Sequence, residues 1–362
     1  MGPPSRPLPG RARRLLPAFL VVLLGASIYR MVLAPAAVEP SPPASPAGNG
    51  TLVLRGETMG TTYAVTVAAS SDGGATRSLV EHELSAVDAA MSTYRRDSEL
   101  SALNRADAGA AVAVSPSLRE VLVVALDVGE RSGGALDVTV GPLVDAWGFG
   151  PADAGAAPGA VELEALRPLY GEGAIELQAA GVHKRSAAVR CDLSSVAKGY
   201  AVDRVSAALA RAGHTSFLAE VGGEVSARGA RPAGGDWRIG IERPDVPGRA
   251  ILRAIPLRDI GMATSGDYRN FRRLAEGRVS HILDPRTGRP AQSALASVTV
   301  LHPVVARADA WATALSVLGP EEGARLAERE GLRALFVVRA GQGELRSMES
   351  AALSRYLRDT SP

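Results

Sequence analysis

Cysteine is almost absent from this sequence, which removes one source of information about the protein. The single residue, Cys191, cannot form a disulfide within the chain, so cysteine usage does not reveal the redox compartment. An excess of charge is also lacking: 40 basic and 38 acidic residues give a formal net charge of +2, which offers no argument for nucleic-acid binding. Aromatic residues make up only 4%, whereas 46% hydrophobic and 22% charged residues are typical of a globular protein.

Several enzyme signatures are missing as well. The chain has no P-loop, no G-x-S-x-G nucleophile elbow and no H-E-x-x-H zinc motif, which narrows the class of enzyme. Four of the five histidines do not pair at metal-ligand spacing: His82, His183, His214 and His302. The fifth, His281, lies within a dense group of polar residues, although a single histidine is often structural rather than catalytic.

Arginines and apolar residues mark the N-terminus. Four arginines precede an apolar run at residues 15–28, which is the pattern of a secretory signal peptide. The alternative is an uncleaved membrane anchor, although the run is shorter than the roughly 20 residues that span a bilayer. In either case most of the chain is exported. We expect a signal or anchor at residues 1–34, a Pro/Ala-rich tether at residues 35–50 and one folded, catalytic domain at residues 51–362.

The rest of the chain predicts an α+β protein rather than a doubly wound α/β sheet, because short strands with hairpin-like spacing are interrupted by single helices. Strands are expected at residues 52–54, 61–67, 182–184, 189–192, 217–221, 224–227, 237–242, 251–256, 297–302 and 334–338, with 182–184 and 189–192 paired as a hairpin. Helices are expected over residues 80–91 after a capping box of Ser78 and Glu81, from Ser115-Pro116 to Ser132, and at residues 306–318.

Three polar segments stand out in a chain rich in alanine, valine and leucine. In the first, residues 280–290, a strand is expected to end at Ile282 and Leu283, and one histidine, one aspartate and two arginines surround the turn that follows. The others are residues 264–270, just upstream, and residues 309–313, just downstream. Each alone is typical of a surface loop, but loops on rigid elements also carry chemistry, and three together favour a functional site.

Residues 192–200 are expected to run from a strand into a helix that closes near Gly213. A serine-rich turn of this kind presents main-chain N–H groups at the positive end of a helix, which suits a phosphate. An ordinary helix cap would have the same sequence, so the segment alone leaves both possibilities open.

Several segments match one protein family, in the order in which they occur there. They are Thr58-Met59-Gly60-Thr61-Thr62-Tyr63; Met91-Ser92-Thr93-Tyr94 and Asp97-Ser98-Glu99; Gly141-Pro142-Leu143-Val144 and Trp147-Gly148-Phe149-Gly150; Asp192-Leu193-Ser194 and Lys198-Gly199-Tyr200-Ala201-Val202-Asp203; Gly222-Gly223-Glu224; Thr264-Ser265-Gly266-Asp267-Tyr268-Arg269-Asn270; Ser280-His281 and Asp284-Pro285-Arg286-Thr287-Gly288; and Asp309-Ala310. Any one match is weak, but their ordered occurrence over roughly residues 52–340 is specific. By these segments the chain resembles the ApbE-like family of bacterial FAD:protein FMN transferases.

The resemblance implies a fold of mainly antiparallel sheets with flanking helices, in two closely packed subdomains. It also implies a magnesium-dependent enzyme in the periplasm that splits FAD, attaches FMN through its phosphate to a threonine hydroxyl of a target protein, and releases AMP. The implied partners are FAD, exported acceptor proteins that are subunits of membrane redox complexes, and the membrane itself. Family members are often lipoproteins, but no lipobox cysteine follows the apolar run here, so that run must provide any anchoring.

The resemblance further implies roles for particular residues. It places the metal on Asp309, Thr313 and an oxygen at Ser195. Asp309 and Thr313 are four residues apart, so they lie on one face of a helix. It places flavin contacts at Met59, Ser92, Thr93, Tyr94, Ala135, Leu136, Asp137, Asp192, Lys198 and Leu283. His281 would take the threonine proton, because a hydroxyl is a poor nucleophile until deprotonated, with Tyr268 and Asp284 as the alternative bases. Some relatives carry a second carboxylate where this chain has Ala312, which lowers the expected charge at the metal.

Two other functions share these features. An FAD pyrophosphatase would use the same metal and flavin sites with water as the acceptor, giving FMN and AMP. A non-catalytic flavin-binding module would bind FAD without releasing AMP, but the presence of Asp309, Thr313 and His281 argues against it. The chain carries no acceptor-type motif of its own, so self-modification is not expected.

Overall fold

The computed structural model describes residue 2 and residues 45–47, 50–109, 111–151, 156–244, 250–266, 271–274, 277–341 and 344–360. The chain divides into two units, Met1–Ser41 and Pro42–Pro362, and the fold described below is that of the second. The apolar N-terminal run lies outside the described residues, so its role as signal or anchor stays a prediction. Within the described ranges, no helix is long and apolar enough to cross a membrane.

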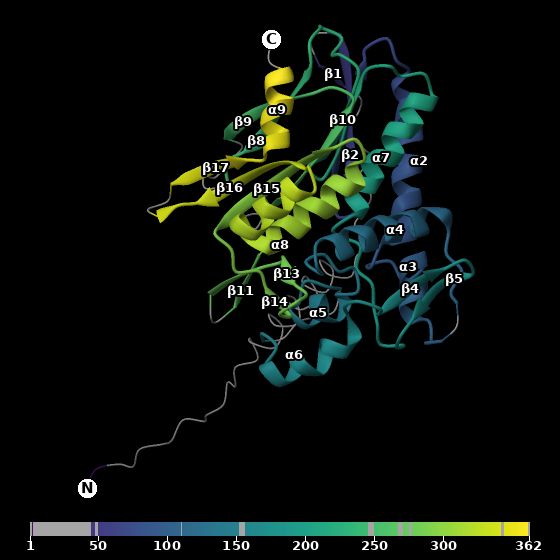
Figure 1. Cartoon of the computed structure of the whole chain (residues 1–362). Coiled ribbons are helices and arrows are strands. Elements are labelled where there is room, and N and C mark those ends of the chain that lie inside the picture. The colour runs from purple at the N-terminus through teal and green to yellow at the C-terminus, as the bar shows by residue number, and fades with distance from the viewer. Residues whose placement is uncertain are drawn as a thin grey trace. The chain divides into compact units, whose positions relative to one another are not determined.

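A nine-stranded antiparallel sheet forms the centre of the second unit (Figure 1). In spatial order its strands are β1 (Ser45–Ala47), β2 (Thr51–Thr58), β3 (Thr61–Ala68), β6 (Phe217–Val221), β7 (Glu224–Arg228), β10 (Ile260–Gly266), β15 (Leu295–His302), β16 (Arg333–Arg339) and β17 (Leu345–Glu349). In β3 the buried residues Tyr63, Val65 and Val67 alternate with more exposed ones, as expected for strands that bury one face. The antiparallel sheet confirms the predicted α+β class.

Helices cover one face of this sheet. They are α2 (Gly73–Met91), α7 (Ala197–Arg211) and α8 (Val305–Arg329), and α4 (Pro116–Arg131) packs against α8. The main hydrophobic core lies between these helices and the sheet, where it includes Val300 of β15 and Phe336 of β16. Helix α8 packs mainly on β10 and β15, and a Cβ added to Gly261 of β10 would lie 2.4 Å from Val305 Cγ2, which places the start of α8 near the middle of the sheet.

The opposite face of the sheet is covered by the hairpin of β8 (Trp237–Glu242) and β9 (Ile251–Leu257) and by α9 (Ala351–Asp359). Leu301 and Leu335, each the chain neighbour of a residue in the main core, belong to this second core instead. The switch between adjacent residues follows from the two-residue period of a strand. The central strands are therefore buried on both faces.

The remaining elements are short. They are α3 (Glu99–Arg105), α5 (Gly141–Ala146), α6 (Ala160–Leu166), η1 (Arg167–Leu169), β4 (Ile175–Gln178), β5 (Gly181–Lys184), β11 (Phe271–Leu274), β12 (Gly277–Ser280), β13 (Leu283–Asp284) and β14 (Arg289–Pro290). A third small core joins α5 and α6 to β13 through Leu143, Trp147, Leu163, Tyr170 and Leu283. Trp147 also donates a hydrogen bond from Nε1 to the carbonyl of Gly288, at 2.9 Å, which fixes the β13–β14 turn.

Three local predictions were wrong. Strand β5 pairs with β4, and residues 189–192 form no strand because their main chain bonds the segment before α5: Asp192 N donates to Val138 O and Gly141 N donates to Arg190 O. Helix α2 begins at Gly73 under a cap from Asp72, not at the Ser78 capping box. The strand before His281 ends at Ser280, and Leu283 starts a new one.

Two other local features complete the comparison. The Ser115 cap of α4 is confirmed, with its Oγ accepting a hydrogen bond from Leu118 N at 3.2 Å. Residues 45–47, which the sequence assigned to the tether, pair with β2 as strand β1.

Candidate active site

The N-termini of α7 and α8 meet at a close contact of main chain. A Cβ atom added to Gly199, in the first turn of α7, would lie 2.5 Å from Val305 O and 2.8 Å from Ala306 Cα. Only glycine allows this approach. Because the N-terminus of a helix carries partial positive charge, the contact brings two positive helix ends together, which favours anionic groups between them.

Each helix supplies the carboxylate that caps the other. Asp309 of α8 accepts a hydrogen bond through Oδ2 from Gly199 N at 3.0 Å. Asp203 of α7 accepts hydrogen bonds from Val305 N at 2.8 Å and Ala306 N at 2.9 Å. The residues that precede the two helices, valines in both cases, provide no side-chain cap. The serine-rich turn before α7 is thus not an ordinary N-cap, and Asp309 takes one of the N–H groups expected for a phosphate.

Asp203 gives the fold a testable dependence on pH. Burial raises the pKa of its carboxyl to about 6 from an ordinary value of 3.8, against the effect of its two N–H donors. The folded state therefore binds this proton more tightly than the unfolded state. Its contribution to stability is fully present below about pH 4 and is lost as the pH rises through about 6.

We accordingly predict that the wild type loses unfolding free energy relative to Asp203→Asn, on the order of 1–3 kcal/mol, as the pH rises across this window. Urea unfolding of both proteins over that range provides the measurement. A difference between them that stays constant with pH would contradict the shifted Asp203 pKa.

Lys198, also in the first turn of α7, lies between two buried carboxylates. Its Nζ is 2.8 Å from Glu224 Oε1 and 3.7 Å from Asp309 Oδ2, and Glu224 and Asp309 are only 2% and 5% exposed. Burial alone would lower the pKa of Lys198, but the carboxylates outweigh it and hold that pKa above its usual value. Burial raises the pKa of Asp309, a shift that a bound divalent cation would oppose.

The residues expected to hold magnesium fit that ion. The hydrogen bond and the ion pair of Asp309 both use Oδ2, which leaves Oδ1 for a cation. Thr313 lies one turn further along the same helix and is half-buried, and Ser195 lies just before α7. One carboxylate and neutral oxygens are the hard ligands that magnesium takes, with water or substrate phosphate completing the set. In the described part of the chain, no three His, Cys, Asp or Glu side chains cluster as a metal site.

His281 lies in the short connection between β12 and β13. Its ring is half-buried and packs edge-on against Phe149, with 6.4 Å between ring centroids and 68° between ring planes. Asp284, an alternative base, is 8% exposed, and its carboxylate is held by the guanidinium of Arg286 at 3.0 Å. Arg286 thus contacts both oxygens of the Asp284 carboxylate. The other alternative, Tyr268, lies outside the described residues.

Tyr94 connects the His281 region to the end of α2. Its side chain is 69% exposed, and its hydroxyl donates to the carbonyl of Phe149 at 3.4 Å. Burial of the hydroxyl end, together with the carboxylates of Asp192 and Asp145, raises the pKa of Tyr94. An exposed aromatic face of this kind suits the stacking of a flat ring. The structure therefore brings Tyr94, Asp192 and His281 to one region around Phe149.

Other predicted flavin contacts have structural partners already. Asp137 accepts hydrogen bonds from Thr139 and from Gly171 N, and Ala135 and Leu136 are buried in the main core. Ser92 Oγ accepts weak hydrogen bonds from the main chain two and three residues ahead, which shapes the turn that includes Thr93. Leu283 packs in the third core. These side chains already have partners within the fold, and their binding roles stay predictions.

Met59 and Thr61 approach the Lys198 side of the site through a β-turn. Met59 occupies the left-handed region with φ of 48° and is half-buried. A Cβ added to Gly222 would lie 3.2 Å from Thr61 Oγ1 and 3.1 Å from Lys198 Cδ. The structure thus places the Thr58–Tyr63 motif beside Lys198.

Glu224 and Asp203 both lie in segments that match the family, but the sequence alone indicated no role for either residue.

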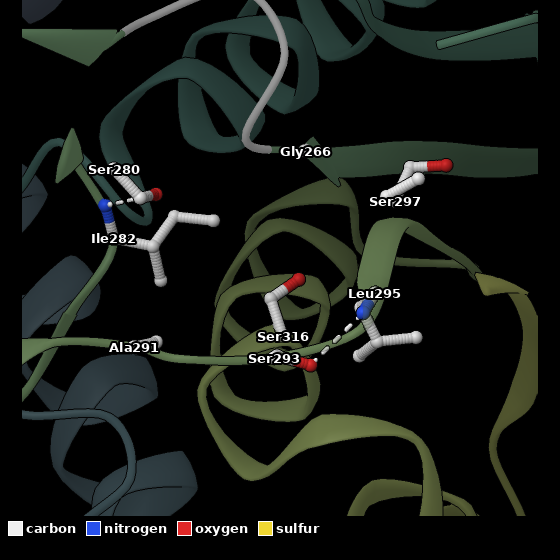
Figure 2. Close-up of a pocket in the computed structure, with 9 residues that line it drawn as sticks. Gly266, Ser280, Ile282, Ala291, Ser293, Leu295, Ser297 and Ser316 are labelled. Atoms are coloured by element: carbon white, nitrogen blue, oxygen red, sulfur yellow. Dashed lines mark hydrogen bonds between the residues drawn. The ribbon is translucent and has the colours of Figure 1, made fainter. Parts of the chain in front are cut away.

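A small cavity adjoins this site, between α8, β15 and the connection before β13 (Figure 2). Its volume of about 20 Å³ accommodates a water-sized group rather than a nucleotide. Figure 2 shows Ser297 and Ser316 on its wall, and their buried hydroxyls find no hydrogen-bond partner among the described residues. Because Ser316 is one turn beyond Thr313 and Ser280 precedes His281, the cavity is a polar niche beside the candidate site.

The fold agrees with comparisons to known proteins. Residues 59–336 match the ApbE family, and the chain belongs to that family. An FAD:protein FMN transferase from Klebsiella pneumoniae (strain 342) is 36% identical over 337 residues, which cover 90% of this chain and 93% of the relative. An FAD:protein FMN transferase from Vibrio cholerae is 39% identical over 294 residues, which cover 80% of this chain and 88% of the relative.

Solved structures show the same likeness. The flavin transferase ApbE from Vibrio cholerae superposes with a TM-score of 0.78 at 36% identity, covering 86% of this chain and 99% of that chain. The apo form of the Pseudomonas stutzeri flavinyl transferase ApbE gives a TM-score of 0.77 at 39% identity, and the match covers 84% of this chain and 96% of that chain. The predicted fold family is confirmed.

Proposed function

We propose that the protein is an FAD:protein FMN transferase that modifies a threonine of an exported acceptor protein. The acceptor hydroxyl forms a new O–P bond to the FMN phosphorus, the pyrophosphate P–O bond breaks, and AMP leaves with the bridging oxygen. The hydroxyl proton passes to a base on the enzyme. The convergence of the α7 and α8 N-termini on Asp309 and Lys198 carries this proposal, since it provides the charges that a pyrophosphate reaction needs.

Magnesium would be held by Asp309 Oδ1, Thr313 and an oxygen at Ser195, where it would supply charge neutralisation for the pyrophosphate. Lys198 presents a permanently charged ammonium next to Asp309 and can bind a phosphate oxygen. Tyr94 offers its exposed ring to the flavin, and Asp192 lies beside it. His281, next to Phe149, accepts the proton of the acceptor hydroxyl.

The test is an incubation of the enzyme with FAD, magnesium and candidate exported acceptor proteins. Transfer predicts equal amounts of released AMP and of acceptor carrying one FMN, detected by intact-protein mass spectrometry. Free FMN as the main flavin product would instead identify a pyrophosphatase. FAD binding without AMP release would identify a non-catalytic module.

We also propose that the enzyme works outside the cytoplasm, tethered or directed there by residues 1–34, since arginines precede the apolar run in that segment. Deleting residues 1–40 should leave a soluble enzyme with unchanged turnover, because every described element starts at or after Ser45. Gel filtration and AMP release of the truncated protein provide the measurement. An aggregated or inactive product would show that the N-terminus belongs to the folded domain.

A further inference from the structure

Glu224 is a buried carboxylate for which the proposed reaction has no assigned use. It opens β7 directly after the Gly222-Gly223 turn and is 2% exposed. A buried charge must be paired to remain ionised at acceptable cost. Glu224 Oε1 makes such a pair with Lys198, whereas Oε2 is buried without a hydrogen-bond partner in the described part of the chain.

The two carboxylates around Lys198 hold it unequally. The 2.8 Å contact with Glu224 is a charge-assisted hydrogen bond, whereas 3.7 Å to Asp309 is too long for one. The ammonium is thus anchored on Glu224 and only loosely associated with Asp309. The lysine stem is also confined, because Gly222 leaves no room for a Cβ between Lys198 and Thr61 without a close contact.

This arrangement sets the charge that a cation meets. Two carboxylates and one ammonium leave a formal charge of −1, and because the ammonium is bonded to Glu224, that charge resides on Asp309. If Glu224 were removed, Asp309 would be the remaining carboxylate near the Lys198 ammonium among the described residues. Lys198 would then neutralise the carboxylate that the metal needs and would withdraw from any phosphate.

We propose that Glu224 is a positioning residue, which holds the Lys198 ammonium off Asp309 so that Asp309 stays open to a divalent cation. This inference rests on the proposed function, because it assigns Asp309 to the metal. Glu224 touches neither substrate nor metal in this scheme and acts through Lys198 alone.

The test measures binding of Mn²⁺ by electron paramagnetic resonance in the full chain, with ADP present as a pyrophosphate that cannot donate FMN. Glu224→Gln should weaken Mn²⁺ binding about 10-fold or more, because Lys198 would then pair with Asp309. A 10-fold loss of affinity corresponds to roughly 1.4 kcal/mol of binding free energy. The matched control is Glu83→Gln, which removes a carboxylate that is 8% exposed and paired with Arg204 at 2.9 Å. That variant should lower the melting temperature without changing Mn²⁺ affinity.

Two further variants separate position from charge. Glu224→Asp keeps the charge but is too short to hold Lys198 in place, so Mn²⁺ binding should still weaken. The double variant Lys198→Met/Glu224→Gln removes the competing ammonium and should restore Mn²⁺ affinity close to the wild-type value.

The opposite results would overturn the proposal. Wild-type affinity in Glu224→Asp would mean that charge alone matters, and weak binding in the double variant would mean that Glu224 contacts the metal directly. A loss of melting temperature in Glu224→Gln with unchanged Mn²⁺ affinity would reduce Glu224 to a structural role. Absence of Mn²⁺ binding by the wild type would instead count against the metal site itself and the proposed function.

Discussion

The Asp309→Ala variant will release no AMP from FAD at physiological magnesium concentrations. Asp309 supplies the one carboxylate among the expected metal ligands, which are Asp309, Thr313 and Ser195. Neutral oxygens at Thr313 and Ser195 bind magnesium too weakly on their own to replace it. The same substitution leaves the Gly199 N–H without its acceptor inside the fold, which costs about 1–3 kcal/mol of unfolding free energy.

The appropriate comparison is Asp309→Asn, which keeps an oxygen for Gly199 N but removes the charge. We expect Asp309→Asn to melt close to the wild type and still to lose AMP release, which separates the metal role from the capping role. Steady-state AMP release over a magnesium titration, beside a thermal melt, gives both quantities. Near-normal turnover in Asp309→Ala would disprove the metal assignment.

Much of the fold was predictable from local sequence because the signals were local. The alternation of Tyr63, Val65 and Val67 predicts a half-buried strand, and the structure has it. Ser115-Pro116 predicts the start of α4 correctly, since a cap and a proline at the first turn need no distant partner. The hairpin expected at residues 182–192 failed because the main chain of residues 189–192 bonds the distant segment at residues 138–141.

The candidate site likewise has features that local sequence predicts and features that depend on distant contacts. A four-residue spacing on a predicted helix was enough to place Asp309 and Thr313 on one face of α8. The roles of Asp203 and Glu224 depend instead on contacts with residues far away in the chain, such as the 102-residue separation between Asp203 and Val305. No periodicity or motif spacing encodes which carboxylate caps which helix, so only the packed structure reveals it.

The second large effect is expected at His281. His281→Ala should reduce FMN transfer on the order of 100-fold or more, the usual range for loss of a positioned base. FAD affinity should change little, because in the proposed function the pyrophosphate charge would be met by a metal held on Asp309, by Lys198 and by the helix N-termini. Because a histidine base must be neutral, transfer by the wild type should decline at low pH, and the alanine variant should lack this decline.

A structural role for His281 predicts a different set of results. If the ring serves only to pack against Phe149, His281→Ala should lower the melting temperature and weaken FAD binding while turnover of bound FAD persists. Single-turnover transfer at saturating FAD, measured beside a thermal melt, distinguishes the two roles. His183→Ala is the matched control, since His183 lies on β5 opposite Glu176 of β4, carries no assigned role in the site and should leave the transfer rate unchanged. A destabilised His281→Ala protein that transfers FMN at the wild-type rate would rule out the base.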